Sequence, residues 1–227
     1  MSSSGENGEV DDGIPSMANQ SLLRDLPTTA RGLRTRSALI AAARTVFERD
    51  GFLDARLADI SAEAQCSAGT FYTYFSSKDE IFAAVLAVAQ EEMLHPGMAH
   101  VAGADNPVAI IDASNRAYFE SYRRNAKLMA LLEQVSHVDP QFRELRQKRT
   151  DAFVQRNARS IESLQKRGLV DPAMDPLFAS RALSSMTSRL AYGYFCNVDS
   201  AEITEDDMDL LTRNTTRIWT NALRIES

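Results

Sequence analysis

The chain has 227 residues, 44% of them hydrophobic, and a formal net charge of −6. That length and apolar content suffice for a folded core, while the acidic balance excludes a protein that binds nucleic acid over its whole surface, so any such contact must be a local patch. The two cysteines, Cys66 and Cys196, lie too far apart in sequence to suggest a disulfide framework or a metal site, which favours a reducing compartment.

The first 30 residues are rich in Ser, Gly, Asn and Asp, and we expect them to form a mobile arm. The arm becomes basic at Arg31, Arg34 and Arg36, where it could reach phosphates or the minor groove; a solubilising tail with solvated arginines is the alternative. The longest apolar run, residues 81–89, is well short of the ~20 residues that span a membrane. We therefore expect neither a signal peptide nor an anchor, and a cytoplasmic location.

A first helix is predicted over about residues 35–49. Its apolar positions recur at helical spacing and form one stripe, made by Leu39, Ile40, Ala43, Val46 and Phe47. Asp50 and Gly51 close the helix, because glycine accommodates the backbone turn that ends helices. We expect this helix to support the segment that follows it.

That next segment is predicted to form two short helices and the start of a third. The first covers about residues 57–64, and Ser67 is placed to cap the second, about residues 68–75. Ser77 with Glu80 three residues later is a capping box that opens a longer apolar helix. Two short helices joined by a tight turn form a helix-turn-helix, whose second helix enters the DNA major groove.

The run from Ala64 to Ile81, AQCSAGTFYTYFSSKDEI, resembles the DNA-binding signature of the TetR family of bacterial transcriptional regulators. The resemblance covers about Arg31 to Met93. Two departures stand out: Gln65 occupies the position of the family's usual turn glycine, and Ala55-Arg56 replace threonines that usually cap the first motif helix and touch the DNA backbone.

The resemblance implies an all-α fold with an N-terminal three-helix DNA-binding domain (residues 31–93, motif at about 55–75) and a C-terminal helical ligand-binding and dimerisation domain (residues 104–227). It places Thr70, Tyr72 and Tyr74 on the recognition helix. Lys78 would hold a phosphate. Most other candidates carry hydroxyl groups, which donate to phosphates and can meet base edges; the full DNA-binding set is Arg34, Arg36, Ser67, Gly69, Thr70, Tyr72, Thr73, Tyr74 and Lys78.

Two alternatives remain open within the motif. Tyr72 or Tyr74 could serve only in packing. Cys66 could be a redox switch in the turn, although a small buried residue is the interpretation we favour, since its position in the motif normally takes a small apolar side chain.

Breaks at residues 95–97 and 103–107 separate the two predicted domains. Beyond them every long segment has helical periodicity and none alternates as a strand. Helices are expected at about residues 107–124, around Leu128 to Val135, and at about 140–166, 176–196 and 204–225.

Polar and aromatic side chains on these helices are candidates for an effector site. Asn115 falls within an apolar stripe, as do two arginines of the long helix, and a buried polar group needs a partner. The candidate set is Asn115, Tyr118, Tyr122, Met129, Arg149, Phe153, Arg156, Met186 and Tyr194. Plain core packing, or pairing of the arginines with acidic side chains or at a dimer surface, is the alternative. The expected effector is largely apolar with one polar or anionic end, and fatty acids or acyl thioesters are the first candidates.

The last predicted helix carries an apolar stripe at alternating three- and four-residue spacing. Its members are Met208, Leu211, Thr215, Ile218, Ala222 and Ile225. We expect a homodimer held by the last two helices of each subunit. The alternative is that the stripe packs only against its own chain.

No serine-nucleophile motif, phosphate-binding glycine loop or metal-ligand spacing is present, and His95, His100 and His137 lack partners at ligand distance in the sequence. We therefore expect no catalytic residue, metal or cofactor. The predicted function is a ligand-responsive regulator, expected to be a repressor, that binds double-stranded operator DNA as a homodimer. The resemblance implies that the effector acts through the fourth helix to change the separation of the two recognition helices. The alternative is an all-α small-molecule-binding or catalytic protein with an incidental helix-turn-helix.

Overall fold

The computed structural model describes residues 26–94, 106–197 and 202–225, with the side chains of residues 90–94, 145, 149 and 152 left out. The described residues form helices and no strands, so the all-α prediction is confirmed. The nine helices are α1 Ala30–Asp54, α2 Leu57–Glu63, α3 Ala68–Tyr74, α4 Lys78–Leu94, α5 Pro107–Arg124, α6 Ala126–Val138, α7 Pro140–Lys166, α8 Pro176–Phe195 and α9 Glu205–Ala222.

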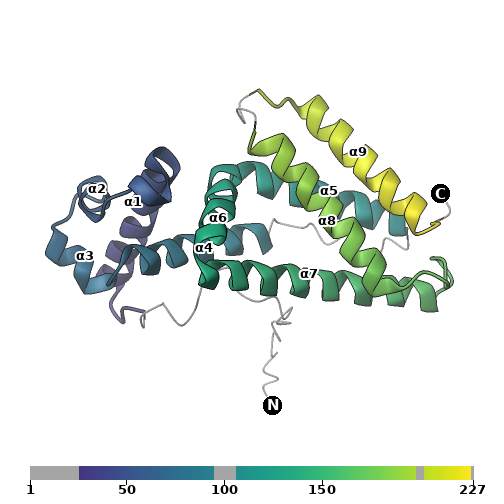
Figure 1. Ribbon diagram of the computed structural model, residues 1–227, viewed down its shortest axis with the longest axis horizontal. Helices are drawn as coiled ribbons and strands as arrows, with labels where there is room; N and C mark the ends of the chain where they lie inside the picture. The colour runs from purple at the N-terminus through teal and green to yellow at the C-terminus, as the bar shows by residue number, and fades with distance from the viewer. Residues whose placement is uncertain (1–25, 95–105, 198–201, 226–227) are drawn as a thin grey trace, which may run out of the picture.

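The helices are arranged in two groups (Figure 1). Helices α1–α4 form one end of the molecule, and α5–α9 form the other. The two groups meet where α1 packs on α6 and α4 packs on α5. The predicted domain boundary, with His95 and His100, and most of the predicted N-terminal arm lie outside the described residues.

Helix α1 begins earlier than the sequence suggested. The Thr29 hydroxyl accepts a hydrogen bond from the Gly32 N–H (3.1 Å), which caps a helix that starts at Ala30. Arg31, Arg34 and Arg36 therefore belong to a rigid helix and not to the basic end of an arm, which corrects the expectation. Near its other end the helix turns at Gly51 (φ 80°), where the sequence predicted closure.

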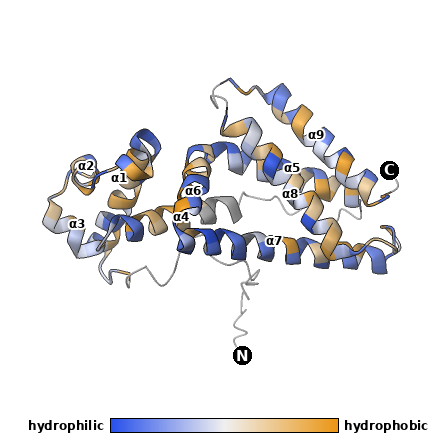
Figure 2. Cartoon of the chain, viewed as in Figure 1, coloured by the Kyte–Doolittle hydropathy of each residue, from blue (hydrophilic) through white to orange (hydrophobic). Residues whose placement is uncertain are grey.

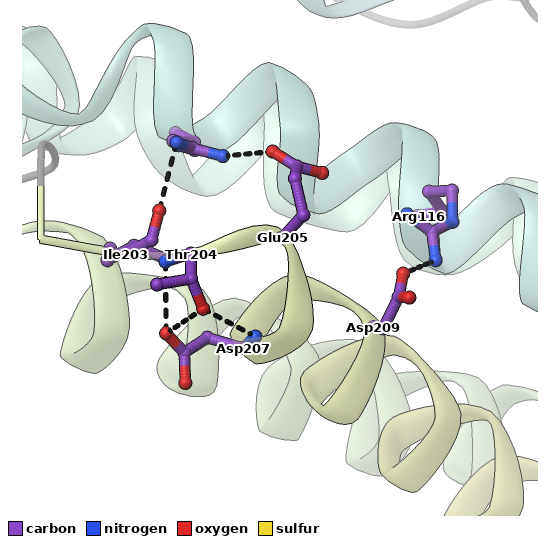
Figure 3. A network of polar contacts seen from close by, with 7 residues as sticks. Arg116, Ile203, Thr204, Glu205, Asp207 and Asp209 are labelled. Atoms are coloured by element: carbon purple, nitrogen blue, oxygen red, sulfur yellow. Dashed lines mark hydrogen bonds and ion pairs between the residues drawn. The ribbon is translucent and has the colours of Figure 1, made fainter.

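Helices α5 and α9 are joined by polar contacts along their outer edges (Figure 3). Arg116 of α5 pairs with Asp209 of α9, and Arg123 pairs with Glu205 (2.9 Å). Thr204 and Asp207 form a capping box that starts α9: the Asp207 carboxylate accepts from the Thr204 N–H (3.0 Å), and the Thr204 hydroxyl accepts from the Asp207 N–H (3.2 Å). These contacts fix which face of α9 turns toward α5.

The inward face of α9 is the stripe that the sequence assigned to dimerisation. Met208, Leu211 and Thr215 are at most 5% exposed within a single chain. Ala222 and Ile225 are partly buried against a second core cluster, so Ile218, 45% exposed, is the member that remains accessible. The buried members of the stripe therefore pack within their own chain, as the alternative stated, and Ile218 is the member left available to an interface between subunits.

Four phenylalanines join the two groups of helices. Phe82 of α4 lies 5.2 Å from Phe47 of α1, 4.7 Å from Phe52 and 5.4 Å from Phe142 of α7, measured between ring centroids. Phe47 and Phe82 are fully buried and Phe142 is nearly so. We call these residues the aromatic joint, because they connect the helix-turn-helix end to the first turn of α7.

Candidate DNA-binding surface and ligand cavity

The turn between α2 and α3 is formed without glycine. Gln65 has a left-handed backbone (φ 52°). Its N–H donates to the Ala62 carbonyl (3.0 Å), and the Cys66 N–H donates to the Ser61 carbonyl (3.0 Å). This pair of bonds is a Schellman motif, which usually has glycine at the left-handed position. The departure noted in the sequence therefore leaves the turn geometry unchanged but adds backbone strain.

Replacing Gln65 by glycine should stabilise the protein. A side chain in the left-handed region costs about 1–2 kcal/mol, and the greater unfolded-state freedom of glycine offsets about 0.5–1 kcal/mol of that gain. We expect Gln65→Gly to raise the free energy of unfolding by about 0.5–1 kcal/mol in urea titrations. The control is Gln134→Gly, an exposed position inside α6, which should lose about 1 kcal/mol. Equal destabilisation by both changes would contradict the argument.

Helix α3 is anchored on one side and open on the other. Phe71 and Phe75 are fully buried. The Ser67 hydroxyl caps the helix by accepting from the Thr70 N–H (3.2 Å) and also contacts the Thr70 hydroxyl (3.0 Å). The opposite side exposes Gly69, Tyr72 and Thr73. A short helix held by its apolar face and displaying hydroxyls outward has the form of a recognition helix.

The two motif tyrosines differ in environment. Tyr72 is 55% exposed, and its ring meets Phe71 edge-on. Tyr74 is half-buried and packs against the main core. Tyr72 is therefore the better placed of the two to reach a base edge, while Tyr74 contributes to packing.

Lys78 is bound by its own chain. Its ammonium group donates to the carbonyls of Leu53 (3.0 Å) and Ala55 (3.2 Å) and lies 4.8 Å from the centre of the Phe52 ring. These contacts tie the first turn of α4 to the end of α1, directly before α2. The sequence predicted a phosphate contact for Lys78; in the structure its side chain holds the motif in position.

Removing the Lys78 charge should destabilise the fold. Hydrogen bonds to charged groups contribute about 1.5–3 kcal/mol, less where water competes, so Lys78→Met should lower the free energy of unfolding by about 1–2 kcal/mol. Lys148→Met removes an exposed ion pair with Glu144 and should change it by less than about 0.5 kcal/mol. A loss no larger than the control's would show that the carbonyl contacts contribute little.

The predicted DNA-binding arginines lie on α1. Arg34 is exposed, whereas Arg36 is half-buried with its guanidinium 5.2 Å from the centre of the Phe75 ring. Burial lowers the pKa of Arg36, and the charge of nearby Glu80 partly offsets this effect. Arg36 therefore packs against the end of α3 and does not extend toward DNA.

Glu80 fixes the start of α4. It is 3% exposed, and its carboxylate accepts from the N–H and the hydroxyl of Ser76, both at 2.6 Å. The Ser77 hydroxyl accepts from the Glu80 N–H (3.1 Å), as the predicted capping box requires. The Glu80 carboxylate thus accepts from the backbone N–H of Ser76 and not from that of Ser77, one residue earlier than the sequence pattern suggested.

Cys66 is half-buried in the motif turn, where it packs against the core. Burial raises the pKa of its thiol. The reactive thiolate is therefore less populated at neutral pH than in a free cysteine, which argues against the redox alternative.

The C-terminal helices enclose a partly open cavity of about 990 Å³. Six predicted effector residues line it: Asn115, Tyr118, Tyr122, Met129, Phe153 and Arg156. Two others do not, because Met186 packs against the second core cluster and Tyr194 is 42% exposed away from the cavity wall. The side chain of Arg149 lies outside the described residues. Sequence reasoning missed Arg146, Arg159, Arg189, Tyr192 and Trp219.

Two polar side chains on α5 are fixed inside the cavity wall. The Asn115 amide donates to the Thr216 hydroxyl of α9 (3.2 Å). Tyr122 is buried, and burial, followed by the nearby Cys196, raises the pKa of its hydroxyl. Tyr122 therefore stays neutral at physiological pH and can act as a hydrogen-bond donor in the cavity.

The cavity wall adjoins the contact between the two groups of helices. Asn125, at the junction of α5 and α6, is fully buried and donates to the Ser121 carbonyl (3.0 Å). Arg44 of α1 donates to the Asn125 side-chain oxygen (3.0 Å) and the Arg124 carbonyl (3.2 Å). Asn125, where α1 is held, thus lies three positions along the chain from the cavity residue Tyr122.

Neither a metal site nor a membrane span is found in the part of the chain that the structure describes. Its His, Cys, Asp and Glu side chains form no group that could hold a metal ion. Its helices include none with the length and apolar character needed to cross a bilayer.

Together these observations describe a helix-turn-helix domain joined to a helical domain that contains a cavity. The model of the bacterial regulatory proteins of the tetR family matches residues 39–85, which cover most of α1, all of α2 and α3, and the first 8 of the 17 residues of α4. The chain is 21% identical over 185 residues to the HTH-type transcriptional regulator UidR of Escherichia coli strain K12, covering 82% of this chain and 91% of UidR.

Solved structures share the whole architecture. Salmonella enterica GusR superposes with a TM-score of 0.67 at 20% identity, covering 87% of this chain and 98% of GusR. SmeT, the repressor of the Stenotrophomonas maltophilia multidrug efflux pump SmeDEF, superposes with a TM-score of 0.64 at 20% identity, covering 85% and 91%. Residues 39–85 thus match the DNA-binding domain of the tetR family, and most of the chain shares the fold of these solved structures.

Proposed function

We propose that this protein is a dimeric repressor that leaves its operator when a small molecule fills the C-terminal cavity. One observation carries the proposal: the same chain holds a recognition helix and a cavity that are structurally connected. The recognition helix is anchored and exposes Tyr72 and Thr73. The wall of the cavity reaches the contact between the two helix groups. Since operator DNA lies in the cytoplasm of a bacterium, we place the protein there.

Release would follow from movement at the α5–α6 junction. An effector that contacts Tyr118 and Tyr122 displaces α5, and Arg44 transmits that displacement to α1 through its bonds at the junction. The family resemblance implies this role for the fourth helix, α4, and the Arg44 bonds favour α1 as a second route. Because recognition helices must match successive major grooves about 34–36 Å apart, a shift of a few ångströms is enough to weaken binding.

The exposed faces of α8 and α9 are our proposed dimer interface. These helices run side by side in opposite directions along one flank of the molecule (Figure 1). Their apolar residues that face solvent include Phe178 (68% exposed), Leu210 (50%) and Ile218 (45%). Two such helices from each subunit would form a four-helix interface around a two-fold axis.

The proposal is tested by a mobility-shift assay with the DNA upstream of the protein's own gene. Tyr72→Ala should weaken specific binding by about 1–3 kcal/mol, the loss expected for one good base contact, and leave the fold intact. Tyr72→Phe separates the hydroxyl from the ring. The control is Leu53→Ala, which shortens another exposed apolar side chain of the same domain (75% exposed). Failure of the unaltered protein to bind would overturn the function, and full affinity of Tyr72→Ala would overturn the residue's role.

A further inference from the structure

The cavity in the C-terminal domain has a lining that specifies the chemistry of its ligand. We propose that it binds an anionic ring compound that carries hydrogen-bonding groups along one edge, and not the fatty acid or acyl thioester that the sequence suggested. The inference rests on the proposed function, because it assigns the chemical class of the effector. Three properties of the wall carry it: its charge, its two contacts between an arginine and a ring, and its unequal sides.

The charge of the lining is positive. Among the described residues that line the cavity are four arginines, Arg146, Arg156, Arg159 and Arg189, and one acidic residue, Glu133. The Glu133 carboxylate already pairs with Arg146 at 2.5 Å. Arg159 and Arg189 leave the lining with positive charge that attracts an anion, although the whole chain is acidic.

The guanidinium groups of two of these arginines lie over aromatic rings. That of Arg156 lies 5.2 Å from the centre of the Phe153 ring, and that of Arg189 lies 5.3 Å from the centre of the Tyr192 ring. A carboxylate or sulfonate binds to the in-plane N–H groups of a guanidinium, which a cation–π contact with a ring does not use. Both guanidinium groups thus have an aromatic neighbour that itself lines the cavity, which reduces the ordering cost of binding an anion.

The side of the cavity formed by α7 and α8 carries a group of polar side chains beside Phe153, Ile161 and Leu164. Hydrophilic residues prevail along α7 (Figure 2). Thr150, Asn157 and Ser160 of α7 face the cavity together with Ser184 and Ser188 of α8. The Asn157 amide donates to the Ser184 hydroxyl (3.1 Å), which links the two helices. An unbranched acyl chain offers no group to pair with such a wall, and its burial there would remove these side chains from water without replacement.

The opposite side, formed mainly by α5 and α9, suits the face of a ring. Ile111 and Tyr118 of α5 and Trp219 of α9 line it. The Trp219 indole N–H donates to the Thr187 hydroxyl (2.9 Å), so the orientation of this large flat side chain is fixed. A ligand with one apolar face and one charged, hydrogen-bonding edge meets both sides at once. The volume of about 990 Å³ is at the upper end for small-molecule sites and admits more than a single ring.

The charge assignment is tested with two dyes that share one ring system. 8-Anilinonaphthalene-1-sulfonate carries an anionic group, and N-phenyl-1-naphthylamine is the same molecule without it; both report binding by fluorescence. We expect the sulfonate to bind the full-length protein at least tenfold more tightly. Arg156→Gln and Arg159→Gln should each weaken sulfonate binding about tenfold, as expected for one charge-assisted hydrogen bond, and change binding of the neutral dye less than threefold. Lys148→Gln removes a charge from α7 outside the cavity lining and should change neither.

Two results would overturn the assignment: equal affinity for the two dyes, or sulfonate binding that is insensitive to both arginine changes. A competition experiment tests the ring and its polar edge. Chlorogenate, a ring acid with several hydroxyls, should displace the sulfonate dye at lower concentration than decanoate, which has the same charge on an acyl chain. If decanoate is the better competitor, the ligand class is wrong. Operator binding by the same variants without dye is measured in parallel, so that loss of the proposed function is distinguished from a wrong ligand.

Discussion

Replacing Leu210 and Ile218 together by aspartate should convert the protein to monomers and weaken operator binding about 100-fold or more, because each buried apolar anchor of an interface contributes about 2 kcal/mol. Both side chains are half exposed in the single chain, so their replacement places charges in the proposed interface without disturbing the core. Sedimentation velocity measures the assembly and a mobility-shift assay measures the affinity. A monomer presents one recognition helix and loses the gain from binding two half-sites at once.

The matched control for this variant is Val138→Asp. Val138 is 68% exposed at the end of α6, away from the outer faces of α8 and α9. It should leave the protein dimeric and able to bind DNA. A Leu210→Asp/Ile218→Asp protein that stays dimeric would move the interface to another face, and a monomer that binds the operator with unchanged affinity would show that dimerisation is not needed for recognition.

Phe82→Ala should cause the largest loss of stability that we expect from one substitution. Phe82 is fully buried in the aromatic joint, in contact with Phe47, Phe52 and Phe142. Removal of a buried phenylalanine ring costs about 3–5 kcal/mol, from lost transfer free energy and the cavity left behind. Chemical unfolding followed by circular dichroism measures the loss.

A control on the same helix distinguishes the joint from a general effect on α4. Val88 is 43% exposed, so Val88→Ala should change the free energy of unfolding by less than about 1 kcal/mol. If Phe82→Ala costs no more than this control, the four rings do not form the rigid connection that we describe. The outcome also bears on signalling, because the joint is a path from α7 to α4 that does not involve Arg44.

Helix positions were predictable where local chemistry marks them. Pro107, Pro140 and Pro176 each occupy the first helical position, after Asn106, Asp139 and Asp175, whose side chains cap α5, α7 and α8. The predicted starts of these helices agree with the structure for this reason. The start of α1 was missed because its cap, Thr29, follows a polar segment that resembles a disordered arm.

The inward face of α9 shows what periodicity leaves open. Its spacing identified a buried stripe, and the stripe is buried, but periodicity does not say which surface covers it. The surface that packs on the stripe is decided by contacts between residues that are distant in sequence, such as Arg116 with Asp209 and Asn115 with Thr216. These pairs could not be inferred without knowing that α5 and α9 are neighbours.

The cavity was only half predictable for a related reason. Aromatic residues such as Tyr118 and Tyr122 stood out on α5 as large side chains at helical spacing. The polar wall did not, because Ser184, Ser188 and Arg189 of α8 have the composition of a solvated surface. One signal was available in the sequence. These three residues share one face of α8 with Tyr192, because they precede it at intervals of three and four residues.

The length of α7 has a further consequence. Pro140–Lys166 is one helix of 27 residues, about 40 Å long at 1.5 Å per residue. Phe142 in its first turn belongs to the aromatic joint, and Leu164 near its last turn lines the cavity. A rod of that length pivoting about its first turn by only about 3° moves its far end by about 2 Å. A displacement of that size is smaller than the separation of two carbon atoms in van der Waals contact. Small chemical changes in a ligand should therefore decide between inducers and molecules that bind without effect.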